Sequence, residues 1–343
     1  MSQIPMNGPG SDIAGPPSAY RSLVLPEEMR RLCQPVTWRV VRDLGLIWVQ
    51  ILAAMALYVA HPAPWTYGVA FALIGGGQHG LMLATHEFAH YSLFPGRRRL
   101  NDFLGTWFFA APSGIPLRTF RQRHFKHHRT FSTADDPKTF YRHDLRGSGL
   151  LRTVLRSVSG WEFVSHVLEA RTQETRERAE GRPAGPGLSR ELPPLAVTQC
   201  VLFAGFWIVG HPWLYVTLWI LPLVTLTHLL QMFRAAMEHR PPVEQQGTAP
   251  GSGYYGETPG PFVRTVRASA LERLFICKLN FGFHVEHHLW PQVSYQFLPA
   301  LRERLDAAGA FNDPRYAREP SYVSTIYRLW RPRGEPEGSR SGS

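Results

Sequence analysis

Two long stretches of the chain carry no charged side chain. Residues 44–85 and 192–233 contain no Asp, Glu, Lys or Arg. Each is about twice the length of the roughly 20 residues that cross a bilayer as a helix. A proline-containing turn interrupts each stretch near its middle, at His61-Pro-Ala-Pro64 and at Gly210-His-Pro212. The pattern predicts two helical hairpins, and so an all-α integral membrane protein with four spans, at about residues 44–60, 65–85, 192–210 and 213–233.

Residues 103–117 form a shorter apolar segment between the two hairpins. Prolines at 112 and 116 interrupt it, and it is too short for a full crossing, so we expect a re-entrant or interfacial segment. The three consecutive glycines at 75–77 weaken the second predicted span as a helix. We therefore expect them to allow close packing against a neighbouring helix.

The polar parts of the chain predict further elements and two tails. The charge run at 171–180, within a long polar insert, is typical of a solvated helix, and residues 298–307 have the apolar spacing of an amphipathic helix. Residues 1–24 and 331–343 are predicted to be disordered tails. The prediction is thus one membrane domain over residues 25–330, in which a cytosolic helical cap carries the polar segments.

The net charge of +11 lies outside the apolar stretches. Neither short turn carries Lys or Arg, whereas basic residues flank the histidine-rich segments described below: Arg97, Arg98, Arg99, Arg118, Arg121, Arg123, Lys126 and Arg129. Because Lys and Arg in short loops stay in the cytoplasm, we expect those segments and both termini to be cytoplasmic, in a multi-pass protein of the cell (inner) membrane. The charge suits anionic lipid headgroups or an acidic protein partner, and the charge-free spans argue against nucleic acid.

The chain contains three cysteines, Cys33, Cys200 and Cys277, which are too scattered for a disulfide framework or a Cys-x-x-Cys pair. The N-terminal residues lack the basic-then-apolar layout of a signal peptide. We therefore expect reduced cysteines and a first span that acts as its own insertion signal.

Histidines are concentrated in three short clusters. The pattern His-x-x-His-His occurs twice, and a third cluster has the form His-x-x-x-His; the members are His284, His287 and His288, then His124, His127 and His128, then His86 and His90. Residues three and four apart lie on one face of a helix, so each cluster is predicted to point its imidazoles at one spot. Imidazole is a common metal ligand, and eight of them exceed the four that a zinc ion takes, which indicates two metals. His79, near the first cluster, is a candidate for contact with this site.

Three other interpretations of the histidines are weaker. His86-Glu87-Phe-Ala-His90 matches the zinc-protease pattern, with Glu87 as general base, but a protease leaves six clustered histidines without a role. A membrane metal carrier would place ionisable residues near the bilayer midplane, whereas these lie at and beyond the predicted helix ends. A solvated histidine-rich loop does not explain why the same spacing recurs.

The three clusters together resemble the histidine boxes of the membrane fatty acid desaturase and hydroxylase family, over about residues 44–305. Leu289-Trp-Pro291 and Asp136-Pro137 are also similar to family sequences. The resemblance implies two non-haem irons on the cytosolic face, held by the eight histidines and a ninth ligand from the end of the last span. His239 looks like that ninth ligand, with His228 the weaker candidate. Asn280 resembles an asparagine near the site in relatives, but its spacing departs from theirs.

The resemblance also implies an activity, with O2 as co-substrate and two electrons supplied from outside. Imidazole binds several metals, but oxidising an unactivated C–H bond requires a metal that changes oxidation state, which zinc does not. We expect desaturation of an acyl chain of a fatty acid or lipid in the membrane; carotenoid ketolation or hydroxylation, or lipid hydroxylation, are the alternatives. His284 stands where front-end desaturases have glutamine, which argues against that branch. No cytochrome b5 segment is visible, so the electron donor is expected to be a separate ferredoxin- or cytochrome-like protein.

Overall fold

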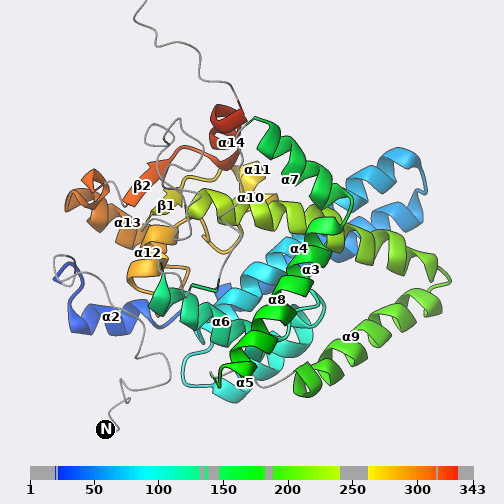
Figure 1. Cartoon of the computed structure of the whole chain (residues 1–343), viewed down its shortest axis with the longest axis horizontal. Helices are drawn as coiled ribbons and strands as arrows, with labels where there is room; N and C mark the ends of the chain where they lie inside the picture. The colour runs from blue at the N-terminus through cyan, green and yellow to red at the C-terminus, as the bar shows by residue number, and fades with distance from the viewer. Residues whose placement is uncertain are drawn as a thin grey trace, which may run out of the picture.

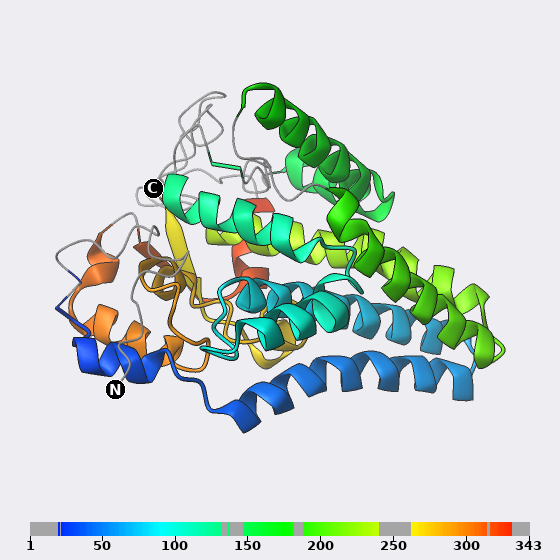
Figure 2. The ribbon, with the colours of Figure 1, turned by 90° about the horizontal axis from the view of Figure 1, so that it is seen from below.

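Helices α3 (Thr37–Ala60) and α4 (Pro64–Ala89) form the first hairpin. The computed structural model describes residues 20, 22–131, 136–137, 147–181, 188–239, 262–313 and 316–330. The two helices run side by side (Figure 2). Proline opens α4, where its missing amide hydrogen costs nothing, and the Thr66 hydroxyl accepts a hydrogen bond from the Ala63 amide at 3.0 Å.

The glycines of α4 lie where neighbouring side chains come closest. A Cβ on Gly77 would be 2.4 Å from Ile51 Cγ1, and one on Gly75 would be 2.8 Å from Leu226 Cδ2. Ile51 belongs to α3 and Leu226 to the second hairpin, so α4 is packed from two sides. The predicted close packing at the glycines is confirmed.

The second hairpin pairs α9 (Leu188–Ile208) with one long helix that follows it. This helix begins with two π-helical segments, η3 (Tyr215–Ile220) and η4 (Leu223–Thr227), and continues as α10 (His228–Glu238). Pro222, between the π segments, has no amide hydrogen to donate. The carbonyl five residues before it, that of Thr217, accepts instead from the Tyr67 hydroxyl of α4 at 3.0 Å. The Gln78 side chain of α4 also donates to the Trp219 carbonyl at 2.8 Å, so both contacts tie the two hairpins together.

Within the described residues, three helices are long and apolar enough to cross a membrane: Thr37–Ala60, Glu191–Ile208 and Tyr215–Glu238. Helix α4 has 26 residues but does not meet that criterion of composition, so the four-span topology stays a prediction. Two helices also continue past their predicted spans, α4 to Ala89 and α10 to Glu238. The apolar pattern marks only the part of a helix that lies in the membrane. The backbone hydrogen bonds continue where the helix enters polar surroundings, so the helix is longer than the predicted span.

Between the hairpins, the segment expected to be re-entrant folds as α5 (Arg98–Leu104) and η1 (Gly105–Ala110). A turn follows, and α6 (Leu117–Thr130) carries the second histidine cluster. The carboxylate of Glu191, from α9, accepts hydrogen bonds from the Arg118 and Thr119 amides at 2.7 and 3.1 Å. These amides have no partner within α6, so Glu191 caps the helix from another hairpin.

The polar insert forms a second layer over α6. It contains α7 (Ser148–Val158) and α8 (Trp161–Ala179), which stand on the side of the bundle away from α3 (Figure 2). The predicted charge run falls mostly within α8, so its helical structure is confirmed. From α8, Glu177 pairs with Lys126 at 2.9 Å, and Gln173 accepts from Arg123 at 2.9 Å.

The C-terminal part contains the feature that corrects the all-α prediction. Strands β1 (Val263–Val266) and β2 (Tyr316–Glu319) form a parallel pair, in which Val263 lies opposite Tyr316. Each strand has four residues, too few for alternation to stand out in the sequence. The chain is otherwise mostly helical, and this part together with the N-terminal approach adds α2 (Pro26–Leu32), α11 (Ala270–Phe275), α12 (His284–Leu289), α13 (Leu298–Ala307), η6 (Ala310–Asn312) and α14 (Tyr322–Trp330).

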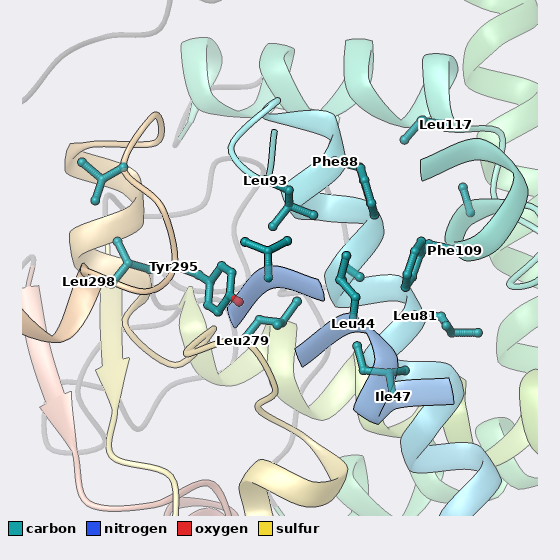
Figure 3. Packing of buried hydrophobic residues seen from close by; sticks show 14 of the residues in the cluster. Leu44, Ile47, Leu81, Phe88, Leu93, Phe109, Leu117, Leu279, Tyr295 and Leu298 are labelled. Atoms are coloured by element: carbon teal, nitrogen blue, oxygen red, sulfur yellow. The ribbon is translucent and has the colours of Figure 1, made fainter. Parts of the chain in front are cut away.

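The predicted amphipathic helix at 298–307 is confirmed as α13. The predicted tails fall almost wholly outside the described residues. A hydrophobic core joins α13 to the hairpins, as Figure 3 shows, with Leu44 of α3, Phe88 of α4 and Phe109 of η1 among its members. The rings of Phe88 and Phe109 lie 5.0 Å apart. The core includes Phe88, which lies between His86 and His90 in sequence, and Leu117, the first residue of α6.

Candidate metal centre

The nine histidines predicted as ligands come from four helix ends that meet in space (Figure 1). His86 lies in the last turn of α4, and His90 is the residue that ends it. Helix α6 carries the second cluster near its C-terminus, and α12 consists largely of the third cluster. His239 immediately follows α10. The structure therefore brings all three clusters and His239 to one place.

The imidazoles form two adjoining groups, each of which could hold a metal ion. We call them the first group, made of His86, His90, His124, His128 and His287, and the second group, made of His127, His239 and His288. In each group, one ligand nitrogen per residue lies within 4.8 Å of all the others. His284 adjoins the second group, since its Nε2 is 3.0 Å from that of His239. The groups touch, with the rings of His128 and His288 4.6 Å apart.

The structure corrects the expectation that each cluster points at a single spot. Residues four apart stay together: His124 and His128 share the first group, while His284 and His288 both lie at the second. The remaining member of each triplet, His127 or His287, joins the other group. Neighbouring residues on a helix are about 100° apart, so His127 and His128 face different sides of α6. Each triplet thus contributes to both groups.

The spacing of the nitrogens fits ligands around a cation. His124 Nε2 lies 2.7 Å from His90 Nε2 and 3.0 Å from His128 Nε2, and His128 Nε2 lies 3.1 Å from His287 Nε2. Two adjacent ligands with metal–nitrogen bonds of about 2.1 Å sit about 3.0 Å apart in octahedral geometry. Each ring nitrogen is either a hydrogen-bond donor or an acceptor, and one hydrogen joins only one pair of nitrogens. Four nitrogens that converge on one point are therefore better accommodated by a shared cation than by hydrogen bonds among themselves.

Buried carboxylates contact several of the imidazoles. Asp136 lies 2.9 and 3.0 Å from His127 Nδ1 through its two oxygens, and both side chains are fully buried. A carboxylate in this position fixes the tautomer and orientation of a ligating ring. Glu238 is placed differently: it lies 3.7 Å from His284 Nε2, the nitrogen that also faces His239, and it is itself paired with Arg234 and hydrogen-bonded by Tyr322 at 3.2 Å.

Glu87 has an orienting position of the same kind. Its Oε1 is 3.0 Å from His86 Nδ1, and its Oε2 accepts from the Ser92 hydroxyl at 2.8 Å. Burial raises the pKa of Glu87 to about 7, and the hydrogen bond from Ser92 opposes that rise. Because its contact is with a ring nitrogen of His86, Glu87 supports a ligand, and the geometry gives no support to the zinc-protease alternative.

Strand β1 positions the third cluster. Thr265 donates its hydroxyl hydrogen to Glu286 at 2.6 Å and forms an isolated antiparallel bridge with Phe283, immediately before α12. Burial raises the pKa of Glu286 to about 7, opposed by the bond from Thr265. The short sheet that the sequence did not reveal is therefore what anchors the six-residue helix α12.

Three other candidates lie outside both groups. His79 Nδ1 is 3.1 Å from the Phe275 carbonyl. The ring of His228 packs against those of Phe163 and His166, at 5.9 and 5.4 Å. Asn280 donates from Nδ2 to the Tyr295 carbonyl at 3.1 Å. Between the two candidates for a ninth ligand, the geometry favours His239.

Sequence reasoning gave no role to Asp136, Glu238, Arg234 or Tyr322. Two of these residues are adjacent to features visible in the sequence. Asp136 belongs to the Asp136-Pro137 pair after the second cluster, and Glu238 directly precedes His239. Arg234 had a signal only in combination with Glu238, since the two are four apart on one helix face. Tyr322 had none, because it reaches Glu238 from a distant helix, α14.

Comparisons with known proteins agree with this arrangement. The family model described as fatty acid desaturase matches residues 29–320. The chain is 29% identical to a β-carotene ketolase of Paracoccus sp. (strain N81106 / MBIC 01143) over 232 residues, which cover 67% of this chain and 76% of that protein. It is 30% identical to a sphingolipid delta(4)-desaturase DES1 of Gallus gallus over 129 residues, 35% of each. A zeaxanthin 4-ketolase of Chlamydomonas reinhardtii is 24% identical over 228 residues, 65% of this chain and 41% of that protein.

The family match covers most of the chain, including all three histidine clusters and the helices that carry them. Three helices are long and apolar enough to cross a membrane, and one of them, Tyr215–Glu238, ends directly before His239 of the buried histidine centre. From these observations, the chain is a membrane protein that belongs to the fatty acid desaturase family.

Proposed function

We propose that this protein is an O2-dependent non-haem di-iron oxidase that acts on a long apolar lipid. The observation that carries the proposal is the pair of adjoining imidazole groups, because two neighbouring redox-active metals would suit O2 reduction. Two irons, when bound, would supply oxidation of an unactivated C–H bond at the cost of two electrons from outside. The nine histidines His86, His90, His124, His127, His128, His239, His284, His287 and His288 would hold them.

The chain's own side chains would hold the ligands still and keep water out. Asp136 and Glu87 orient His127 and His86 through their Nδ1 atoms. Aromatic rings line both groups: Phe281 lies 4.6 Å from His86, and Phe131 lies 5.0 Å from His239. A rigid, buried centre of this kind favours oxidation of one carbon of a bound chain over side reactions with solvent.

The first candidate reaction is ketolation of a carotenoid ring. The similarity to a β-carotene ketolase extends over 67% of this chain, whereas that to a sphingolipid desaturase covers 35%. Two successive hydroxylations of one ring methylene, each consuming O2, two electrons and two protons and releasing water, would give an alcohol and then a geminal diol, which loses water to leave the ketone. Acyl desaturation, the reaction expected from the sequence, is the second candidate, because removal of two hydrogens from neighbouring carbons uses the same centre and the desaturase similarity supports it.

In the proposed topology, the protein lies in the cell (inner) membrane and α4 is the fourth span. Both hairpin turns then face outward, and the histidine centre lies on the cytoplasmic side. A separate acidic electron donor, ferredoxin- or cytochrome-like, would then reach the basic face. Arg97, Arg98 and Arg99 are exposed there, whereas Arg123 and Lys126 are engaged by α8. The three consecutive arginines are therefore the better docking site for such a donor.

Expression in a bacterial host that makes β-carotene tests the proposal. We expect keto-carotenoids if the first candidate is right, and new double bonds in the fatty acids or sphingoid bases of suitable hosts if the second is. Detergent-purified protein should contain about two irons per chain. The matched control is His127→Ala, which should insert into the membrane but yield no product. Zinc in place of iron, with neither pigment nor lipid changed, would contradict the proposal.

A further inference from the structure

In the hairpin of α7 and α8, large apolar side chains face outward and polar side chains face the helical bundle. This is the reverse of the arrangement in a domain that is surrounded by water. On α7, Leu155 is 60% exposed, while Thr153 and Ser157, which face the bundle, are 3% and 0% exposed. On α8, Trp161 and Leu168 are 52% and 53% exposed, while the carboxylate of Glu162 is turned inward. Large apolar side chains outside and small polar ones inside is the pattern of a helix in contact with lipid.

The exposed residues form a continuous stripe, which we call the α7–α8 stripe. On α7 they recur at intervals of four and three, and on α8 at intervals of three and four, so each set occupies one helix face. The members are Leu151, Leu155, Val158, Trp161, Val164 and Leu168. On the inward side, Arg156 pairs with the buried Glu162 at 2.7 Å. The charge of Glu162 is therefore neutralised within the hairpin and does not require contact with water.

The turn between α7 and α8 rests on a candidate membrane span. A Cβ on Gly160 would lie 3.8 Å from Val224 Cγ2, and the ring of Phe163 packs on His228 of the same long helix. Val224 lies nine residues after Tyr215 (224 − 215), well inside the 24-residue candidate span Tyr215–Glu238. Since the hydrocarbon layer is roughly 30 Å thick, a position at this depth along a spanning helix falls within it.

We propose that the α7–α8 stripe is a membrane-contact surface whose occupant is the acyl-chain region of the adjacent bilayer leaflet. The stripe lies on both sides of Gly160, which approaches Val224 of that candidate span, and exposed apolar side chains at such a depth are suited to hydrocarbon and not to water. The C-terminal half of α8 is polar and binds α6, through the pair of Glu177 with Lys126. The hairpin thus joins the bilayer surface to the helix that carries His124, His127 and His128. This inference requires membrane insertion but not the proposed reaction.

Environment-sensitive labels on single cysteines test the proposal in the full-length protein. With Cys33 and Cys200 replaced by Ser and the buried Cys277 left in place, Leu155→Cys and Leu168→Cys carry the label on the stripe. Thr172→Cys and Arg176→Cys are the matched controls, because both positions are exposed on the polar half of α8. The labelled proteins are reconstituted in vesicles of phosphatidylcholine and phosphatidylglycerol, with or without bromine on the acyl chains.

We expect the labels at 155 and 168 to emit at shorter wavelength, to be quenched by brominated chains and to be protected from aqueous iodide. The control labels should show the reverse. Quenching of the stripe labels by iodide would place the stripe in water and overturn the proposal. Protection from both quenchers would mean that a protein surface, such as a second copy of the chain, covers the stripe, and would overturn it equally. Neither readout depends on enzymatic activity.

Discussion

At the residue scale, the centre depends on side chains that fix imidazoles as much as on the imidazoles themselves. Asp136 is the clearest case, because it contacts His127 through both oxygens in a place with no access to solvent. A buried carboxylate is costly unless it is well paired, so its presence there indicates a partner that carries positive charge or an N–H bond.

The substitution Asp136→Asn should weaken metal binding without unfolding the protein. The amide keeps the shape but loses the charge that fixes the tautomer of His127, and loss of such a partner typically lowers metal affinity by about 10- to 100-fold. Metal content after dialysis against graded chelator measures the effect. Asp306→Asn, which removes an exposed pair with Arg318, is the control. Equal metal retention in both variants would show that Asp136 does not support the centre.

A second residue-scale prediction concerns Gly282, which precedes the third cluster. A Cβ there would be 2.5 Å from the Val266 carbonyl oxygen, a backbone atom that cannot move aside easily. Gly282→Ala should destabilise the protein by about 1–3 kcal/mol through overpacking, and should lower metal content by shifting α12. Thermal unfolding in detergent measures the first effect.

Gly205→Ala is the matched control for that change. Nothing lies within 4 Å of a Cβ at Gly205, in α9, and alanine favours a helix over glycine by about 1 kcal/mol. This variant should be as stable as the parent or slightly more so. If Gly282→Ala behaved in the same way, the close approach of β1 to the third cluster would not matter for stability.

At the element scale, the helices that carry histidines are held by elements distant in sequence. Helix α6 is capped by Glu191 of α9 and clamped by Glu177 of α8, while α12 is anchored by β1. The second hairpin and the polar insert therefore set where α6 lies. These contacts leave the imidazole face of each helix available for the metals.

The capping contact gives a prediction at this scale. Glu191→Ala removes the acceptor for two amides at the α6 N-terminus, so we expect a loss of about 1–2 kcal/mol in stability. Glu191→Gln keeps an acceptor oxygen and should lose less. The thermal midpoint of the detergent-solubilised protein ranks the three proteins. An unchanged midpoint in Glu191→Ala would mean that α6 is held by α8 and the core alone.

At the scale of the whole molecule, the metal centre is the point where both hairpins, the polar insert and the C-terminal part meet. Ligands come from α4, α6, α10 and α12, and Asp136 is added from the chain just after α6. A bound metal would therefore cross-link parts of the chain that are far apart in sequence, and its binding free energy would add to the stability of the folded state.

Removal of the metal should accordingly lower the stability of the whole protein. We expect chelation with a strong iron ligand to reduce the thermal midpoint in one cooperative step, and readdition of ferrous iron under anaerobic conditions to restore it. His61→Ala, at an exposed turn remote from the centre, should not alter either midpoint. A midpoint that does not respond to chelation would indicate that the converging imidazoles are stable without a cation.

The amino-acid sequence by itself determined the candidate ligands and much of the helical framework. The spacing of three and four residues survives folding because it is a local property of a helix, and the absence of charge over long stretches marks candidate spans in any context. The glycines at 75–77 indicated close packing for the same local reason. Even the pairing of residues four apart within one group follows from helix geometry.

Only the tertiary structure decided how those ligands are shared between two groups. Which side of α6 meets α4, and which side meets α10, depends on packing between helices that are distant in the sequence, and this divides His127 from His128. The same holds for the strand pair that anchors α12 and for the reversed polarity of α7 and α8. A strand of four residues and a helix face carry no local signal of their partner, because the free energy that selects them comes from contacts that exist only after the chain has folded.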